Sequence, residues 1–157
     1  MFTSRWKRLG ALTVVALLGA VNPALAEEEL TAEDHAQIHQ LYARYVQAID
    51  FGDAIGWADT FTPGGSFGDA VTGRDALIAF AERYHEENGD APRHWYGALV
   101  LAPTAEGAEG RCYAVTFNSR TQSLMWTGTY RDALVKTADG WRFSSRHLTM
   151  DPTENRQ

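Results

Sequence analysis

The sequence changes its hydrophobic period once, near Arg93, and this change constrains the fold more than any other feature. Before Arg93, apolar residues recur every three or four positions, as they do in helices that cover a core. After Arg93 they alternate, in segments separated by turn-forming residues, which is typical of antiparallel strands. Helices followed by a run of strands predict an α+β domain in which three N-terminal helices pack on a strongly curved, mainly antiparallel sheet.

Capping and turn residues set the bounds of the expected elements. Thr31 and Asp34 have the spacing of a capping box, so the first helix should begin there, and Gly52 should end it. The second helix should be short, from 53 to about 61, and be broken by Pro63 and the two glycines after it. A short strand (66–71), a third helix (74–88) and four long strands (93–101, 109–119, 122–136 and 140–150) complete the expected order. The apolar stripe of the third helix is formed by Leu77, Phe80, Ala81 and Tyr84.

The first 26 residues have the pattern of a bacterial export signal. A basic start is followed by an apolar run from 9 to 21 and by the small-x-small cleavage motif Ala24-Leu25-Ala26. The apolar run is too short to span a bilayer comfortably. We therefore expect residues 1–26 to be removed on export to the periplasm or the medium, leaving one domain, residues 27–157, that is free of the membrane.

Composition excludes some partners. The chain has 20 acidic and 14 basic residues, a net charge of −6, and three of the basic residues lie in the export signal. A domain this acidic is a poor partner for nucleic acid or anionic lipid. Cys112 is the only cysteine, so an internal disulfide is impossible, and we expect it to be a small buried residue in a domain held together by packing.

A candidate catalytic pair follows from the end of the first helix and the start of the first long strand. Asp50 ends an apolar helical stripe, and a carboxylate there that is covered by the fold is suited to act as a base or to orient one. Strand alternation places His94, Tyr96, Ala98 and Val100 on one face and Trp95, Gly97, Leu99 and Leu101 on the other. If that face looks toward the helices, His94 enters an apolar interior and needs a partner, for which Asp50 is the most economical choice.

Other residues give weaker signals. Arg146 and His147 alternate in the last strand, so only one of them can face inward, and the pattern leaves open which. His35 and His39 have a spacing that can hold a metal, but no third ligand is in view, so we expect no metal site. The large aromatic residues are expected to be core residues, some of which line a pocket: Trp57, Trp95, Trp126, Phe67, Phe80 and Phe117.

An ordered set of short motifs extends over nearly the whole domain. In order, the motifs are Tyr45 with Asp50, Gly52-Asp53, a helix with Trp57, Gly73-Arg74-Asp75, Arg93-His94 and the terminal segment from Trp141 to Arg146. Together they resemble the SnoaL-like family of the nuclear transport factor 2-like superfamily, whose members have a cone-shaped α+β fold. No single motif is specific, but their order and spacing are.

The resemblance implies a type of chemistry. The chain is similar to scytalone dehydratase, bile-acid 7α-dehydratase and hexachlorocyclohexane dehydrochlorinase, lyases without cofactors in which an Asp–His pair lies in an apolar cone. Their catalytic pattern falls on Asp50, His94, Tyr45 and Arg146, with Arg146 stabilising a developing anion. The expected substrate contacts are aromatic residues: Trp57, Phe67, Phe80, Tyr96 and Trp126. Five residues on an ideal helix turn the side chain by roughly 140°, so Tyr45 and Asp50 share a cavity only if the helix is covered over a wide arc.

Three functions therefore remain open. The leading hypothesis is a cofactor-independent lyase that performs a dehydratase-like elimination on a hydrophobic cyclic or aromatic small molecule. The second is an isomerase of the ketosteroid isomerase type that uses Asp50 as its base; Asp132 is the nearest candidate for the second acid that such enzymes need. The third is a non-catalytic binding protein, because a fold alone does not fix a function. We expect a homodimer or homotrimer, since sheets of this type often pair through their outer faces.

Overall fold

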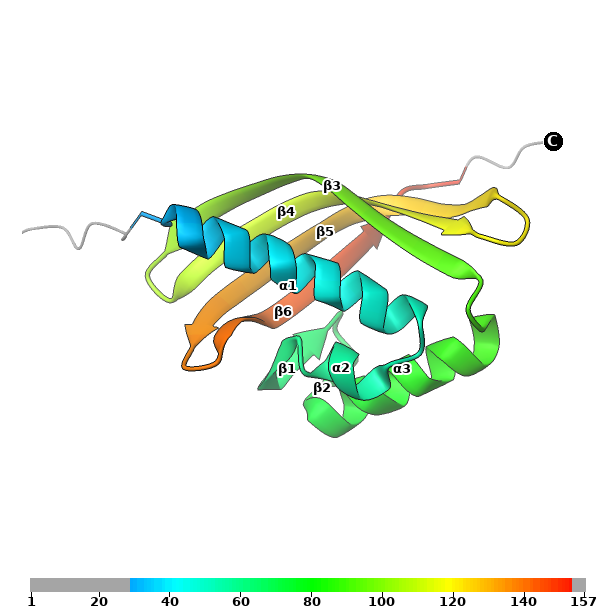
Figure 1. Ribbon diagram of the computed structural model, residues 1–157, viewed down its shortest axis with the longest axis horizontal. Helices are drawn as coiled ribbons and strands as arrows, with labels where there is room; N and C mark the ends of the chain where they lie inside the picture. The colour runs from blue at the N-terminus through cyan, green and yellow to red at the C-terminus, as the bar shows by residue number, and fades with distance from the viewer. Residues whose placement is uncertain (1–28, 154–157) are drawn as a thin grey trace, which may run out of the picture.

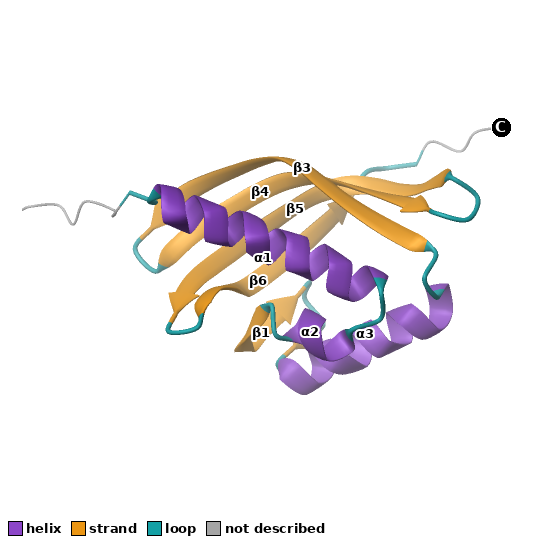
Figure 2. Ribbon diagram, viewed as in Figure 1, coloured by secondary structure: helices purple, strands orange, loops and turns teal. Residues whose placement is uncertain are grey.

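A long helix, α1 (Ala32–Asp50), lies across one face of a six-stranded sheet in the computed structural model, which describes residues 29–153 (Figure 1). Helices α2 (Ala54–Ala58) and α3 (Arg74–Asn88) lie beside the end of α1, and α3 packs against α2 and the two shortest strands (Figure 2). The strands are β1 (Phe61–Phe67), β2 (Val71–Thr72), β3 (Pro92–Thr104), β4 (Gly107–Asn118), β5 (Ser123–Thr137) and β6 (Gly140–Met150). The predicted α+β class is confirmed.

Both ends of α1 are set by the residues that the sequence indicated. The Thr31 hydroxyl accepts a hydrogen bond from the backbone N–H of Asp34 at 3.1 Å, and the Asp34 carboxylate accepts one from the Thr31 backbone at 3.1 Å. At the other end Gly52 has φ +73°, a conformation that favours glycine, and a Cβ there would lie 2.8 Å from the His85 ring. Glycine is therefore required both for the turn and for the close packing of α3, which together fix the position of Asp50.

The sheet order is β2-β1-β6-β5-β4-β3, and every neighbouring pair is antiparallel except β1 with β6. The predicted bounds of β1 are wrong, because this strand begins at Phe61 and includes Pro63, which we expected in a helix-breaking turn. The register of β1 on β6 jumps between Phe61 and Ser66. Proline, which has no N–H to donate, is tolerated in this unpaired stretch.

Strand β3 contains a bulge that the sequence did not indicate. Ala98 has φ +53°, and the pairing with β4 shifts between Gly97 and Val100. The extra residue reverses the alternation beyond this point. Val100 is therefore exposed and Leu99 packs against the core, the opposite of the prediction for both.

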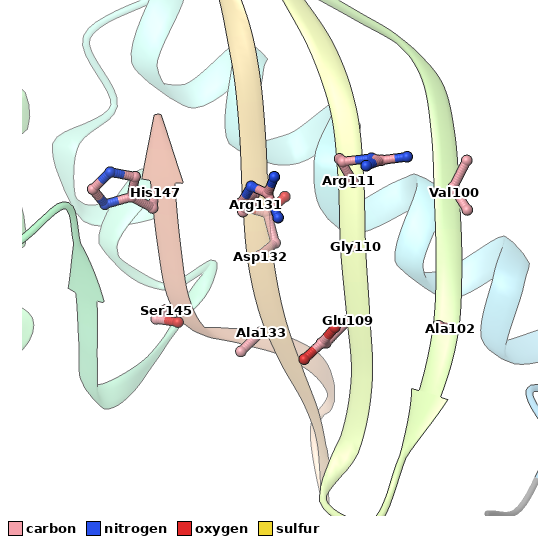
Figure 3. A pocket seen from close by; sticks show the side chains of 10 residues that line it. All are labelled: Val100, Ala102, Glu109, Gly110, Arg111, Arg131, Asp132, Ala133, Ser145 and His147. Carbon is pink, nitrogen blue, oxygen red and sulfur yellow. The ribbon is translucent and has the colours of Figure 1, made fainter. Parts of the chain in front are cut away.

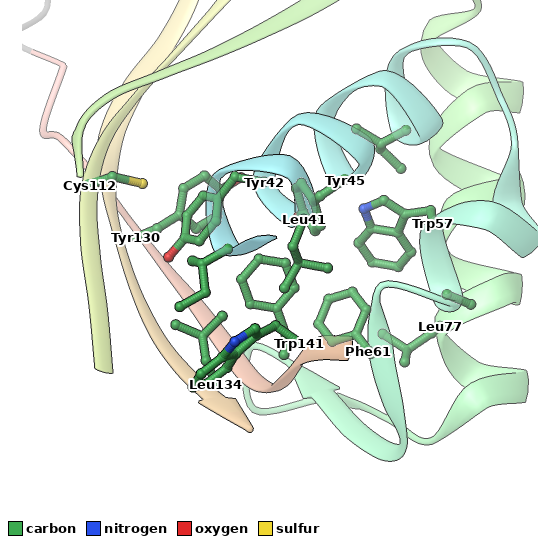
Figure 4. Close-up of a cluster of buried hydrophobic side chains, with 14 of the residues drawn as sticks. Leu41, Tyr42, Tyr45, Trp57, Phe61, Leu77, Cys112, Tyr130, Leu134 and Trp141 are labelled. Carbon is green, nitrogen blue, oxygen red and sulfur yellow. The ribbon is translucent and has the colours of Figure 1, made fainter. Parts of the chain in front are cut away.

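The core fills the space between α1, α2 and the inner face of the sheet (Figure 4). Its largest members are aromatic and come from every layer: Tyr42, Tyr45, Trp57, Phe61, Tyr130, Trp141 and Phe143. Cys112 is buried as predicted, and burial raises the pKa of its thiol to about 11. Trp95 was predicted to be core, which is wrong: it is 67% exposed and packs against Phe117 on the outer face of the sheet.

Within residues 29–153, no helix has the length and apolar character needed to cross a membrane. The expected export signal, residues 1–26, lies outside the described part of the chain.

Candidate active site

Asp50 and His94 meet where the end of α1 contacts the start of β3. The His94 backbone N–H donates to Oδ2 of Asp50 at 2.9 Å, and the Nδ1 atom of the His94 ring contacts Oδ1 of the same carboxylate. Both side chains are buried, with 8% of His94 and 6% of Asp50 exposed. The structure thus brings together the two residues that the sequence paired. Both carboxylate oxygens of Asp50 contact His94.

This contact determines which ring nitrogen of His94 is available. A carboxylate beside Nδ1 favours a proton on Nδ1 in the neutral imidazole, so Nε2 carries the free electron pair. Nε2 lies 3.5 Å from the hydroxyl of Tyr84, and His94 lines an internal cavity. The atom of the pair that can act as a base is therefore on the cavity side.

The cavity has a volume of about 200 Å³ and lies between the three helices and the inner face of the sheet. It is lined by Tyr45, Ile49, Trp57, Phe67, Phe80, Tyr84, His94, Trp126, Tyr130, Leu148 and Met150. None of these residues is an aspartate, glutamate, lysine or arginine. The walls suit an uncharged, apolar molecule.

One wall of the cavity is a continuous row of aromatic rings. Trp57 stacks on Phe80 with ring centres 5.5 Å apart, and Phe80 stacks on Tyr84 at 6.4 Å. Tyr84 packs against His94 at 5.9 Å, and His94 meets the edge of Trp126 at 5.4 Å. A flat ligand that lies along this row would have His94 near one end and Trp57 near the other.

Tyr84 is a site residue that the sequence analysis missed. It was read as one member of the apolar stripe of α3, yet its hydroxyl points at Nε2 of His94. Burial, and then the nearby charge of Asp50, raises the pKa of Tyr84 above its usual value, so the group stays protonated and can donate a hydrogen bond. The signal was available: a stripe that only has to fill a core does not need a tyrosine hydroxyl.

Tyr45 lines the cavity, as the resemblance implied, and is almost completely buried. Burial is the main reason that its pKa is raised well above the ordinary value. Asp50 does not itself line the cavity and acts on it only through His94. The angle of roughly 140° between the two helix positions is therefore no obstacle.

Arg146 was predicted to contact the ligand, and the structure does not place it there. Its guanidinium carbon lies 3.8 Å from the ring centre of Tyr130 and 4.3 Å from that of Tyr45, and both tyrosines line the cavity while Arg146 does not. Its carboxylate partner is Asp132, at 3.4 Å, which also accepts a 2.5 Å hydrogen bond from Tyr42. Arg146 is thus enclosed in the core behind two aromatic side chains.

The orientation of Arg146 also decides two questions that the sequence left open. Arg146 faces inward and His147 outward, where His147 lies 3.8 Å from Asp69. Asp132 is inward-facing and buried, and burial raises the pKa of its carboxyl group. Because Asp132 faces Arg146 rather than the cavity, it does not provide a second acid at the candidate site.

Four of the five predicted ligand contacts line the cavity: Trp57, Phe67, Phe80 and Trp126. Tyr96 does not. Its ring packs on Tyr42 at 5.1 Å and its hydroxyl donates to the backbone carbonyl of His39 at 3.1 Å, which makes it a packing residue between α1 and β3. No cluster of His, Cys, Asp or Glu side chains suited to a metal ion occurs among the described residues.

A larger hollow, of about 480 Å³, lies on the outer face of the sheet (Figure 3). Arg111, Arg131 and His147 form one row across it, and Glu109 and Ser145 belong to the next row. This hollow is open and charged, and His94 is not part of it. Its size alone does not make it the better candidate, because the buried Asp50–His94 pair lies at the inner cavity.

An α+β fold with helices against one face of a curved sheet is the architecture of the nuclear transport factor 2-like proteins. The sequence profile of the SnoaL-like domain matches residues 30–147, and the chain belongs to this family. The resemblance noted from the sequence is therefore confirmed. No match was found among curated proteins.

Solved structures agree with this assignment. A protein of unknown function from Mycobacterium tuberculosis is 30% identical, with a TM-score of 0.70 over 77% of this chain and 73% of that one. A protein from Catenulispora acidiphila, solved in complex with S-DNPA, is 27% identical, with a TM-score of 0.68 over 77% and 96%. A nuclear transport factor 2-like protein from Novosphingobium aromaticivorans, with a cystatin-like fold, is 23% identical and supports the fold alone (TM-score 0.67; 78% and 85% covered).

Proposed function

We propose that the protein is a cofactor-independent lyase that performs a dehydratase-like elimination on a hydrophobic cyclic or aromatic small molecule. The observation that carries the proposal is the position of His94: Nδ1 is held by Asp50, and Nε2 is open to an apolar cavity. An imidazole held in one tautomer is a base of suitable strength near neutral pH. A small-molecule ligand in the related Catenulispora structure is consistent with such a cavity.

The proposed reaction needs only groups of this chain. Nε2 of His94 removes a proton from a carbon atom, the electron pair forms the new double bond, and the bond to the neighbouring oxygen breaks. The proton on Nε2 is then passed to the leaving oxygen, which departs as water, so that His94 returns to its starting state. Asp50 stabilises the imidazolium between the two steps, and Tyr84 donates a hydrogen bond to the oxygen that gains charge.

Tyr45 has a lesser part in this mechanism than the resemblance implied. It is positioned in the wall as a second hydroxyl, and its raised pKa keeps it protonated. We propose that it orients a polar group of the ligand. Arg146 is proposed to act through Tyr45 and Tyr130, which it contacts, rather than on the ligand.

The isomerase alternative is less favoured by the geometry. An Asp-driven isomerisation requires Asp50 to face the ligand, but both its oxygens contact His94 and it does not line the cavity. A non-catalytic binding protein remains the rival proposal, since it would use the same cavity without the basicity of Nε2.

Export and assembly are also proposals. We propose that the domain is exported to the periplasm or the medium and forms a homodimer or homotrimer. Exposed apolar side chains on the outer face of the sheet support the second point: Trp95, Val100 and Tyr113. Molar mass measured by light scattering at several protein concentrations tests it, and a monomer throughout would contradict it.

The proposed function is tested with a panel of hydroxylated cyclic ketones, followed by the ultraviolet absorbance of the conjugated product. The native protein should turn over at least one member, and His94→Asn should not. The exposed His35 supplies the matched control, because His35→Asn makes the same chemical change far from the cavity. Saturable binding without turnover in the native protein would favour the binding protein. Turnover that survives in His94→Asn but is lost in Asp50→Asn would favour the isomerase.

A further inference from the structure

The indole of Trp57 holds a buried hydrogen-bond donor that no group of the described residues satisfies. Trp57 is completely buried and lines the cavity, and its Nε1 atom has no hydrogen-bond acceptor. Aromatic side chains pack around the indole of Trp57. The distances between ring centres are 5.1 Å to Phe61, 5.4 Å to Tyr45 and 5.5 Å to Phe80. A buried donor without a partner is costly, and protein interiors rarely keep one without a reason.

We propose that Nε1 of Trp57 donates a hydrogen bond to an oxygen of the ligand, at the end of the cavity remote from His94. The inference rests on the proposed function and adds the class of substrate to it. The substrate is a planar, uncharged molecule of about two fused rings. It carries an oxygen acceptor at one end and the acidic C–H at the other.

The order of the rings in the wall supports this arrangement. Phe80 and Tyr84 lie between Trp57 and His94: Trp57 stacks on Phe80, Phe80 stacks on Tyr84, and Tyr84 packs against His94 at a tilt. A ligand that reaches both His94 and Trp57 must therefore extend over two ring positions. A single ring with a short substituent would contact only one of the two polar ends.

The volume of the cavity sets the upper limit of the ligand. About 200 Å³ is less than the roughly 300–1,000 Å³ of typical small-molecule pockets, so larger polycyclic ligands do not fit without movement of the walls. The lower limit of its size comes from the two ring positions, Phe80 and Tyr84, that separate Trp57 from His94.

The lining residues also determine the charge of the ligand. No lysine or arginine faces the cavity, and Arg146 is enclosed behind Tyr45 and Tyr130. A carboxylate or phosphate group would be buried without a cation and is therefore excluded. A carbonyl, hydroxyl or ether oxygen can accept from the indole without bringing a charge.

Two probes that differ in one oxygen test the inference. The bicyclic ketone 1-tetralone should bind the native protein about tenfold more tightly than tetralin, which lacks the carbonyl. The variant Trp57→Phe keeps an aromatic wall but removes the N–H, so it should lose most of this preference. Trp126→Phe removes the other indole of the lining and should weaken both probes alike.

A second measurement does not depend on the folding of any variant. In the native protein, the indole N–H resonance of Trp57 in a proton–nitrogen NMR spectrum should move when 1-tetralone is added and move much less with tetralin. A preference for 1-tetralone that survives Trp57→Phe but disappears in Tyr84→Phe would overturn the inference, as would binding of neither probe. These experiments do not measure turnover, so their failure leaves the His94 test of the proposed function untouched.

Discussion

Within residues 29–153, two ion or hydrogen-bond pairs have both the carboxylate and the basic side chain buried, Asp50–His94 and Asp132–Arg146, and they differ in what surrounds them. In the Asp50–His94 pair, one nitrogen is held by the carboxylate and the other faces a cavity. In the Asp132–Arg146 pair, the guanidinium is enclosed by four aromatic rings and its nitrogens have no hydrogen-bond partners among the described residues. Burial is common to both pairs, so what distinguishes the proposed reactive pair is the access of its base, His94, to the cavity.

The two bases also differ in their chemistry. Arginine stays protonated at any physiological pH, and here the nearby Asp132 raises the pKa of Arg146 although burial opposes this. Histidine exchanges its proton near neutral pH. The enclosed pair can provide a fixed charge in the core, whereas the pair at the cavity can take and return a proton.

The largest expected effect on activity comes from a change in the Asp50–His94 pair, which has access to the cavity. Replacement of His94 by asparagine should lower kcat/KM by about a hundredfold to ten-thousandfold, the usual contribution of a positioned base. The free energy of unfolding should change much less, because asparagine can still hydrogen-bond to Asp50. Steady-state kinetics and urea unfolding of the same preparation measure both quantities. Unchanged kinetics would remove His94 from the mechanism.

Changes in the Asp132–Arg146 pair should have the reverse effect, a large loss of stability with little direct effect on catalysis. Arg146→Met leaves the Asp132 carboxylate buried without its cation, so it should lower the free energy of unfolding by about 3–5 kcal/mol. The double variant Arg146→Met/Asp132→Leu should recover most of this loss, because no charge is then left unpaired. Urea unfolding measures these changes. A large loss of activity in a double variant that is fully stable would show that Arg146 acts on the substrate after all.

A smaller effect is expected at Tyr84. Tyr84→Phe removes the hydroxyl near Nε2 of His94 and keeps the ring in the aromatic wall, so kcat should fall by about tenfold with little change in KM. The exposed Tyr113 provides the same substitution on the outer face of the sheet, where no effect is expected. A fall in kcat that is equal in both variants would argue against a specific role for Tyr84.

The smallest effect concerns another buried carboxylate, that of Asp34, whose two oxygens both accept hydrogen bonds. Hydrogen bonds from Lys136, Thr31 and Trp141 hold the pKa of Asp34 well below its usual range. Such a group stabilises the fold above the unfolded-state pKa of about 3.9, and this contribution is lost as the pH falls toward the folded-state value.

Asp34→Asn should therefore lower the free energy of unfolding at neutral pH and flatten its decline below about pH 4. Urea unfolding at several pH values measures this, and Glu106→Gln, at an exposed turn position, is the control. An identical decline in the native protein and in Asp34→Asn would show that the hydrogen bonds of Asp34 do not stabilise the fold.

Most of the fold could be predicted because its signals are local. The capping box at Thr31, the left-handed Gly52 and the change of period near Arg93 each depend on a few neighbouring residues. The bulge at Ala98 does not, because no short pattern demands a positive φ at an alanine. The exposure of Trp95 depends on which face of the finished sheet the helices cover.

Part of the candidate site could likewise be predicted from the sequence, and part could not. The contact of Asp50 with His94 could be predicted because a buried carboxylate and a buried imidazole each need a partner. The enclosure of Arg146 could not, because it results from rings that α1, β5 and β6 bring together only in the folded protein. The order of residues along the chain does not show which rings will surround Arg146 in the folded protein.

The protonation of His94 tests the central claim most directly. In protein labelled with nitrogen-15 at histidine, and with the signals assigned by comparison with His94→Asn, the neutral ring should carry its proton on Nδ1 and leave Nε2 unprotonated. The Nε2 signal should also shift when a ligand fills the cavity. A proton on Nε2 in the neutral ring, with Nδ1 free, would contradict the account, because the nitrogen that faces the cavity could then not act as a base.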